Sequence, residues 1–285
     1  MNLQETFAGL IRRSLLLQGA TSSLAPVGGH PVHHYRVEGT GRGTPIVFVH
    51  GLGGNANGFS GVLRKTAKRF KAAWALDLPG SGFSPLPPDG PISLEAQLEV
   101  LRRFLREVVG EPAFVVGNSL GGAMALTLAA RSPEQVRALG LLAPGGAQLP
   151  ETSRNQLLAS LKVETNADAR AFVRKLFARP SLLTLAFASV LRQMHGTPAV
   201  QACLGEVRTN LGLEADLLTR LSMPVLLLWG GQEKLLPKES LDFFRAHLPK
   251  HAQVELVPEF GHVPQVEHAD EVTRKLSAFA DQHGL

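Results

Sequence analysis

Residues 113–131 read AFVVGNSLGGAMALTLAAR. The apolar run Ala113–Val116 has the character of a buried strand, and Leu120–Arg131 follows it as a helical run. Between them, G-x-S-x-G places Ser119 in a sharp, strained turn, where the flanking glycines let strand and helix approach closely. The start of the helix directs free N–H groups toward any oxyanion nearby. The stretch predicts that Ser119 is a nucleophile; the alternative is a glycine-rich turn with an incidental serine.

Short apolar runs separated by helical segments continue in both directions from this stretch. Continuous apolar strands of this kind belong in a parallel sheet covered on both faces, and the helical segments have the length of crossovers. We therefore expect an α/β protein with a doubly wound, mostly parallel sheet. The other expected strands are His33–Val37, Pro45–Val49, Ala72–Leu76, Ala138–Leu142, Val225–Trp229 and Gln253–Val257.

The alternation of strands and helices stops between residues 147 and 222, where helical patterns occur without a convincing strand. Such a segment between two sheet strands predicts an inserted helical cap, placed over the carboxyl ends of the strands where open α/β sheets bind ligands. Residues 1–146 and 223–285 would then form the α/β core. The most apolar cap helix is expected over Ser181–Met194, and it would line an acyl pocket with Leu182, Leu185, Phe187 and Val190.

Serine is a poor nucleophile without a base, and His262 is the leading candidate for that base. It lies in FGHVP at 260–264, directly after the last expected strand, on a loop at the carboxyl edge of the sheet. A surface loop histidine is the alternative. The histidine cluster around His33 has no carboxylate close in sequence, and His195 falls on a helical pattern where a solvated histidine is expected.

A second glycine-rich turn, HGLGG at 50–54, follows the strand that ends at Val49. It would let the backbone fold close to the serine, so that the N–H groups of Leu52 and Leu120 form an oxyanion hole. Backbone donors suit this role because they are rigid and oriented in advance. The imidazole of His50 is expected to brace the loop rather than act on substrate. A plain turn after a strand is the alternative.

A carboxylate is needed to orient the histidine and to stabilise its imidazolium form. Glu233, in WGGQE at 229–233, is the first carboxylate after the strand Val225–Trp229. Asp77 ends a different strand, in DLPGSG at 77–82, and competes for the role. Its Pro-Gly surroundings favour the anchoring of a loop, so Glu233 is the predicted acid.

Together these segments resemble the bacterial lipase and esterase branch of the α/β-hydrolases, which includes monoacylglycerol-lipase-like enzymes. The resemblance implies the α/β-hydrolase fold and a serine–histidine–acid triad. One departure is Glu233, where the family usually has aspartate. A related placement of the acid, after Ala138–Leu142, finds no carboxylate in APGGA at 143–147. The matching motifs occur in the family's order between residues 46 and 270: HGLG at 50–53, DLPGSGFS at 77–84, GNSLGG at 117–122, WGGQE at 229–233 with Pro237, and GHVP at 261–264.

Composition limits the other function classes. The 285 residues, 44% of them apolar, suffice for one substantial core, and the net charge of +5 is a mild excess. The basic run at 64–71 shows no aromatic interleaving of the kind that suggests base stacking, so no nucleic-acid partner is expected. The single cysteine, Cys203, excludes an intrachain disulfide and a zinc site built from cysteines. The residues imply neither a metal nor an organic cofactor.

The N-terminal segment is read as an amphipathic helix over residues 2–17, because Leu3, Phe7, Leu10 and Ile11 recur at helical spacing. Its apolar run is too short and too soon interrupted for a signal peptide, which favours a cytoplasmic protein. The apolar face is expected to pack on its own domain. The alternative is an interfacial role, with weak peripheral contact to an anionic membrane.

The favoured function is hydrolysis of carboxylic esters, with lipophilic acyl esters as small-molecule or lipid substrates, through an acyl-enzyme on Ser119. The nearest rival is hydrolysis of a carbon–carbon bond in vinylogous diketones, which the pair Asn118-Ser119 also resembles. That chemistry usually comes with a tryptophan after the catalytic histidine, and here Val263 and Pro264 follow His262. An amidase, an acyltransferase, and a receptor-type domain that binds a ligand without turnover remain as alternatives.

Overall fold

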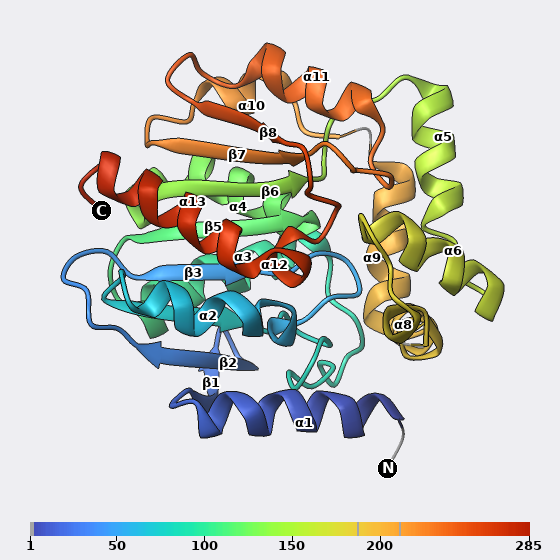
Figure 1. Ribbon diagram of the computed structural model, residues 1–285, viewed down its shortest axis with the longest axis horizontal. Coiled ribbons are helices and arrows are strands. Elements are labelled where there is room, and N and C mark those ends of the chain that lie inside the picture. The colour runs from blue at the N-terminus through green and yellow to red at the C-terminus, as the bar shows by residue number, and fades with distance from the viewer. Residues whose placement is uncertain (1–2, 187, 211) are drawn as a thin grey trace.

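A computed structural model describes residues 3–186, 188–210 and 212–285 (Figure 1). Eight strands form one sheet in the order β1-β2-β4-β3-β5-β6-β7-β8. β1 and β2 run antiparallel to their neighbours, and the pairs from β4 to β8 are parallel. This confirms the predicted doubly wound, mostly parallel α/β sheet. The strands are β1 (Thr21–Val27), β2 (His30–Glu38), β3 (Ile46–Val49), β4 (Ala72–Leu76), β5 (Ala113–Ser119), β6 (Val136–Pro144), β7 (Val225–Gly230) and β8 (Gln253–Val257).

The sequence reasoning missed β1, which pairs with β2 as a hairpin across Gly28 and Gly29. Both glycines have positive φ, 57° and 84°, as tight hairpin turns of the favoured twist require. β1 is a largely exposed edge strand that contains Pro26, so it lacks the continuous apolar character of the central strands. The Gly-Gly pair before a strand is the signal that could have revealed it.

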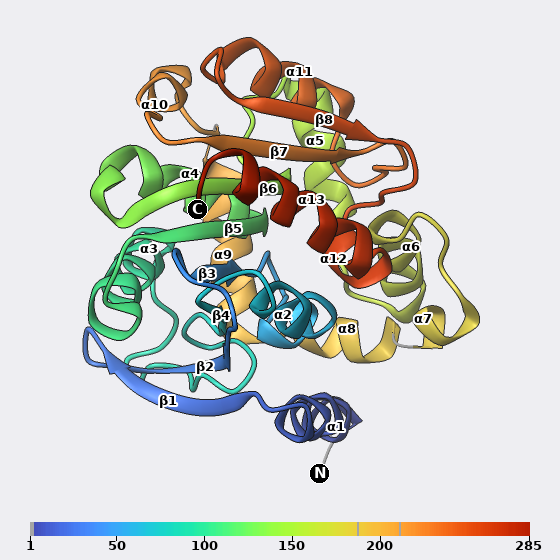
Figure 2. The same ribbon diagram turned by 60° about the vertical axis from the view of Figure 1, so that its left-hand side comes forward.

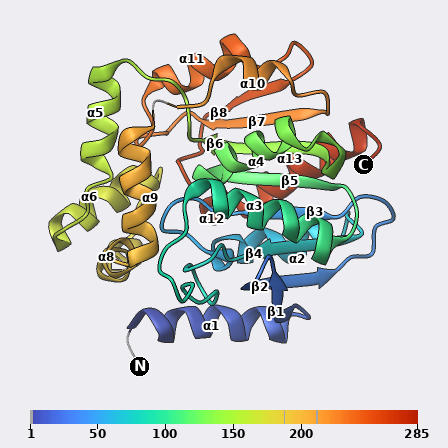
Figure 3. The same ribbon diagram turned by 180° about the vertical axis from the view of Figure 1, so that it is seen from behind.

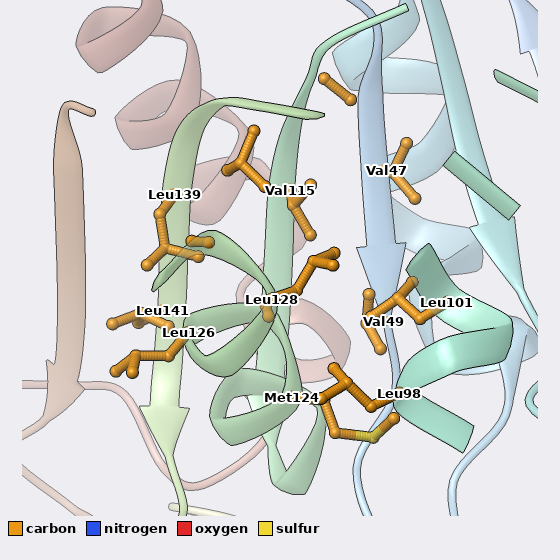
Figure 4. Close-up of a cluster of buried hydrophobic side chains, with 14 of the residues drawn as sticks. Val47, Val49, Leu98, Leu101, Val115, Met124, Leu126, Leu128, Leu139 and Leu141 are labelled. Carbon is orange, nitrogen blue, oxygen red and sulfur yellow. The ribbon is translucent and has the colours of Figure 1, made fainter. Parts of the chain in front are cut away.

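Helices cover both faces of the sheet. On the face toward the viewer in Figure 1, α2 (Ser60–Ala67) and α13 (Ala269–Gln282) pack against side chains such as Phe48 and Phe114. On the opposite face, seen in Figure 3, α3 (Leu94–Phe104), α4 (Leu120–Arg131), α10 (Ala215–Thr219) and α11 (Lys238–His247) contribute to a second core. Figure 4 shows Leu126 and Leu128 of α4 lying against the sheet in this core. Shorter elements are η1 (Ala56–Phe59), η2 (Leu105–Val109), η3 (Pro133–Gln135) and α12 (Pro264–Glu267).

In the segment expected to form a cap, the described residues form helices and no strand, and several of these helices enclose a small core of their own around Phe172 and Val200. Of the helix expected over Ser181–Met194, the described residues are helical in α7 (Leu182–Ala186) and α8 (Ala188–His195), and Phe187 between them lies outside the described residues. α10, near the end of the segment, packs on α4 and α11, so the boundary of a cap at residue 222 stays a prediction. The helices are α5 (Glu151–Ser160), α6 (Asn166–Leu176), α7 (Leu182–Ala186), α8 (Ala188–His195), α9 (Pro198–Thr209) and α10.

The N-terminal helix α1 (Leu3–Leu17) lies beside β1 and the cap helix α8 (Figure 2). Its apolar residues are divided between two sides. Leu15 is buried in the core and Ile11 packs against it, whereas Leu10 is 60% exposed and Leu17 is 83% exposed. The prediction that the whole apolar face packs on the domain is therefore wrong in part. None of the helices in the described part of the chain has the length and apolar character that a bilayer crossing requires.

Candidate active site

Ser119 lies between the end of β5 and the start of α4, with φ 55° and ψ −121°. The backbone of a residue other than glycine is strained at this positive φ, and the surrounding packing maintains the strained conformation. The flanking glycines explain how the turn fits. A Cβ on Gly117 would lie 2.2 Å from the carbonyl oxygen of Gly121, and a Cβ on Gly121 would lie 2.3 Å from that of Val49. The close approach of strand and helix therefore requires glycine at both positions.

The loop after β3 closes over this turn. A Cβ on Gly51 would lie 2.9 Å from Cβ of Ser119, so the glycine lets the backbone reach the serine. The His50 imidazole braces the loop, since Nδ1 lies 2.9 Å from the Gly51 carbonyl oxygen and Nε2 accepts the Leu78 N–H at 3.1 Å. Burial lowers the pKa of His50, in keeping with a neutral ring. Leu52 and Leu120 line the same cavity as Ser119.

The side chain of Asn118 joins the serine turn to the histidine loop. Its Nδ2 donates to the carbonyl oxygens of Leu142 and His262, each at 2.9 Å, and its Oδ1 accepts from Gln265 Nε2 at 3.0 Å. Asn118 is buried, so these bonds fix the backbone of His262 relative to the residue next to Ser119. Sequence reasoning gave Asn118 no such role, because all its partners are at least 24 residues away in the chain.

His262 and Glu233, the predicted base and acid, lie in contact. Their closest atoms, Nδ1 and Oε2, are 2.8 Å apart, and the side chains are 2% and 3% exposed. The other carboxylate oxygen, Oε1, accepts the N–H groups of Leu235 and Leu236 at 2.7 and 3.0 Å. These two backbone bonds curl the loop around the carboxylate, and the longer side chain of glutamate still reaches the ring.

The charge on Glu233 follows from these contacts. Burial raises the pKa of Glu233, but the His262 imidazole and the hydrogen bonds to the carboxylate outweigh burial and hold that pKa below its ordinary value. An ionised carboxylate at Nδ1 fixes the tautomer of the ring, leaving Nε2 as the proton acceptor. Glu233 is thereby suited to orient a histidine base.

Asp77, the competing carboxylate, is held elsewhere. Its Oδ1 accepts the Ala56 N–H at 2.6 Å, and its Oδ2 accepts the Phe83 N–H at 2.9 Å and contacts His33 Nδ1 at 2.7 Å. Both side chains of the His33–Asp77 pair are buried. These contacts anchor the loop at 77–84 to its neighbours, which is the role that its Pro-Gly surroundings favour.

His33 and His195 have surroundings that differ from those expected from the sequence. His33 was set aside for want of a carboxylate close in sequence, yet Asp77 reaches it across the sheet, and Ser22 Oγ lies 2.7 Å from its Nε2. His195 is buried rather than solvated, with its ring centroid 4.9 Å from that of Phe172. Burial lowers the pKa of His195. In both cases the chain fold supplies a partner that spacing along the sequence does not show.

The cap contacts the histidine and acid loops directly. The His262 N–H donates to the Leu176 carbonyl oxygen at 2.9 Å, and the Ala178 N–H donates to Glu267 Oε2 at 2.9 Å. Lys234, next to the acid, donates from Nζ to the Ala178 carbonyl oxygen at 2.9 Å. The segment at 176–178 is thus bound to both loops that carry the candidate triad.

A cavity of about 530 Å³ opens beside Ser119, a size typical of small-molecule sites. Its walls are mainly leucine and other apolar side chains from α3, α4, α5 and the loop at 145–149. The prediction that Leu182, Leu185 and Val190 line the pocket is wrong: among described residues none of α7 or α8 lines the cavity, and Leu182 is 86% exposed. Other residues of the expected cap, such as Leu157 and Leu161, do line it. Phe187 lies outside the described residues.

The α/β-hydrolase-fold family model matches residues 44–269, which includes Ser119, Glu233 and His262. The chain belongs to the α/β-hydrolase fold family. The dihydrolipoyllysine-residue acetyltransferase component of the acetoin cleaving system of Pseudomonas putida is 30% identical over 93% of this chain and 71% of that protein. Lipase 1 of Psychrobacter immobilis is 28% identical over 86% of this chain and 79% of that protein.

Among solved structures, this α/β hydrolase is similar to a bacterial membrane phospholipase A described as a virulence factor. The TM-score is 0.84 and the identity 25%, over 99% of this chain and 92% of that one. These relatives confirm the predicted placement among bacterial lipases and esterases, an enzyme family of carboxylic ester hydrolases. They do not distinguish the monoacylglycerol-lipase-like group within it.

Proposed function

We propose that this α/β hydrolase cleaves carboxylic esters through an acyl-enzyme formed on Ser119. The observation that carries the proposal is the buried contact between Glu233 and His262, tied through Asn118 to the strained turn at Ser119. An aligned histidine and acid beside a serine turn are the parts that nucleophilic acyl transfer requires. Leu52 and Leu120, whose N–H groups are assigned to the oxyanion, line the same cavity as the serine.

In the proposed reaction, Ser119 Oγ attacks the ester carbonyl carbon while His262 Nε2 takes its proton. The N–H groups of Leu52 and Leu120 stabilise the oxyanion of the tetrahedral intermediate. The intermediate collapses when His262 returns the proton to the leaving alkoxide, so the alcohol departs and the acyl group stays on Ser119. Water then attacks the acyl-enzyme with His262 as base, which releases the carboxylic acid and restores the serine.

Lipophilic acyl esters are the substrate class that the cavity favours. Leu157, Leu161 and Leu235 line it near the serine, and the chain's relatives include a lipase. Apolar walls of this kind bind an acyl chain by the hydrophobic effect and offer few partners to a polar substrate. Arg154 of α5 also lines the cavity, so a substrate panel has to separate ester hydrolysis from carbon–carbon cleavage.

A substrate panel tests this function. We expect turnover of p-nitrophenyl esters to exceed that of a vinylogous diketone by at least about 10³-fold, because the site offers an oxyanion hole and an apolar acyl wall. Ester hydrolysis is measured from the absorbance of the released p-nitrophenol. Cleavage of the diketone is measured from the loss of the diketone's own absorbance. Preferential cleavage of the diketone would replace the ester reading, and ligand binding with no turnover of either would favour a receptor.

An acyltransferase would form the same acyl-enzyme. This alternative is considered because one relative of the chain is an acetyltransferase component. The two differ in what attacks the acyl group on Ser119. Adding primary alcohols or thiols to the same assay distinguishes them, since a transferase forms the new ester or thioester in preference to the free acid. We expect free acid to be the main product, measured by chromatography of the reaction mixture.

We also propose that α1 makes a weak peripheral contact with an anionic lipid surface. Leu10 and Leu17 are exposed on the helix, with Arg13 exposed beside them. Burying a leucine in the interface is worth about 1.5–3 kcal/mol, and a basic residue near anionic lipid about 1 kcal/mol. Leu10→Glu is therefore expected to weaken binding to phosphatidylglycerol vesicles by about tenfold or more in a sedimentation assay.

Leu256→Glu is the matched control for that measurement. Leu256 is 52% exposed and lies in β8, at the edge of the sheet opposite β1 and α1. Its substitution adds the same charge without touching α1, so vesicle binding should be much less affected. Equal losses of vesicle binding in the two variants would show that the added charge alone weakens binding. If the original chain does not bind the vesicles, the proposed membrane contact is contradicted.

A further inference from the structure

The cavity beside Ser119 continues along the outside of α4. Its floor includes Leu120, Ala123, Met124, Thr127 and Arg131, which are spaced so that they share one face of a helix. Because α4 begins at the residue after Ser119 and an α-helix rises about 1.5 Å per residue, Arg131 lies about 18 Å along the helix from the serine. The cavity is thus an elongated channel with the serine at one end.

The walls of this channel carry many leucine side chains, and they also include the polar side chains of Arg154, Asn210, Glu214 and Ser240. α4 lies between α3 and α10 on the face seen in Figure 3, and Leu98 of α3 and Leu217 of α10 both line the channel. The one polar residue in the middle of the floor is Thr127, whose hydroxyl donates to the Ala123 carbonyl oxygen at 2.8 Å. That internal bond satisfies the hydroxyl, so Thr127 need not offer it to a ligand.

The far end of the channel is charged. Arg131 Nη1 lies 2.6 Å from Glu95 Oε1, and Arg220 Nη2 lies 2.6 Å from Asp216 Oδ2. All four residues line the channel and their side chains are at least half exposed. An alkyl chain gains nothing by extending among solvated ion pairs. The mainly apolar floor that α4 provides therefore has a defined length, from Leu120 to the ion pair of Arg131.

We propose that this channel binds the acyl chain of the substrate along α4 and limits its length to about 14–16 carbons. The inference rests on the proposed ester hydrolysis at Ser119. An extended chain advances about 1.2 Å per bond, a third of the span of an extended residue, so about 15 bonds cover the floor that α4 provides. The acyl part is assigned because it stays attached to Ser119 in the intermediate, whereas the alcohol has to leave.

Bulky substitutions on the floor of α4 test the length limit. Ala123 and Thr127 lie about 6 and 12 Å along the helix from Ser119. Ala123→Phe is expected to set the longest accepted acyl chain near six carbons and Thr127→Phe near ten. The measurement is kcat/KM for p-nitrophenyl esters from C2 to C20, each profile normalised to the acetate ester of the same variant. Beyond each limit the normalised value should fall at least about tenfold.

Leu182→Phe is the matched control, because Leu182 is exposed on α7 and lies outside the channel. Its profile should follow that of the original chain. Three limits that increase in the order Ala123→Phe, Thr127→Phe, original chain support the channel. Unshifted profiles in both folded α4 variants would overturn it, as would a limit that moves only for acetate esters of graded alcohols. If Ala123→Phe is inactive on every ester, the chain-length limits of Thr127→Phe and Thr127→Trp are compared with that of the original chain instead.

The proposed function and the length limit fail in different ways. An original chain that hydrolyses no ester contradicts the ester hydrolase itself. An original chain that is active but loses activity beyond about eight carbons contradicts only the channel.

Discussion

Replacing Ser119 with alanine is expected to abolish covalent labelling by a fluorophosphonate and to lower kcat for ester hydrolysis by about 10⁶-fold. The reason is that the Ser119 hydroxyl, at the strained turn between β5 and α4, is the proposed nucleophile. The residual rate would reflect binding and the oxyanion hole alone. Intact-protein mass spectrometry measures the labelling, and a thermal melt checks that Ser119→Ala is folded.

Ser22→Ala is the matched control for this experiment. Ser22 also contacts a histidine that is paired with an aspartate, since its Oγ lies 2.7 Å from His33 Nε2 and His33 contacts Asp77. Ser22 lies outside the cavity beside Ser119, however, and its β-strand backbone is unstrained. Ser22→Ala should keep full labelling. An adduct located on Ser22, or on any residue other than Ser119, would contradict the assignment.

Replacing Glu233 with glutamine is expected to lower kcat by about 10⁴-fold while the chain stays folded. Glutamine keeps the shape of the side chain but removes the charge, and its amide can donate to His262 Nδ1. The ring would then be held in the wrong tautomer, with its proton on Nε2. Glu233→Asp should be far milder, because the charge survives and only the reach is shortened. Steady-state kinetics on a p-nitrophenyl ester measures both.

Asp77→Asn separates the triad acid from the loop anchor. Asp77 accepts two backbone N–H groups and contacts the buried ring of His33. Weakening such charge-assisted bonds costs about 1.5–3 kcal/mol, which lowers Tm by roughly 3–12 °C. The folded Asp77→Asn variant should keep most of its kcat. A Glu233→Gln variant within tenfold of the original rate, beside a folded but inactive Asp77→Asn, would show that Glu233 is the wrong acid.

Much of the architecture could be predicted because the relevant signals are local. β5, the serine turn and α4 are contiguous, and the glycines at 117 and 121 are required by backbone contacts that their spacing implies. The parallel pairing of the buried strands follows from their continuous apolar character. Glu233 could be named from its place after β7 alone, and its contact with His262 is in the predicted position.

What could not be predicted depends on contacts across the chain. Asn118 holds the histidine loop through partners up to 147 residues away, and nothing in a serine motif specifies that. Asp77 reaches His33 over 44 residues. The apolar sequence around Leu185 suggested the wall of a ligand pocket, but Leu185 packs against the small core of the cap. An apolar helix face indicates burial without indicating which neighbour covers it. The channel along α4 arises from three helices that are distant in sequence.

The bonds at 176–178 have a consequence for how such enzymes diversify. The backbone that supports His262 belongs to the inserted segment, and Lys234 and Glu267 of the flanking chain hold it in return. A cap attached in this way is not an interchangeable module. Grafting the cap of another enzyme onto this scaffold would remove a support of the histidine unless the new loop offers the same carbonyl and N–H groups. Changes of specificity are more readily accommodated in α5 and α10, which border the channel without supporting the triad.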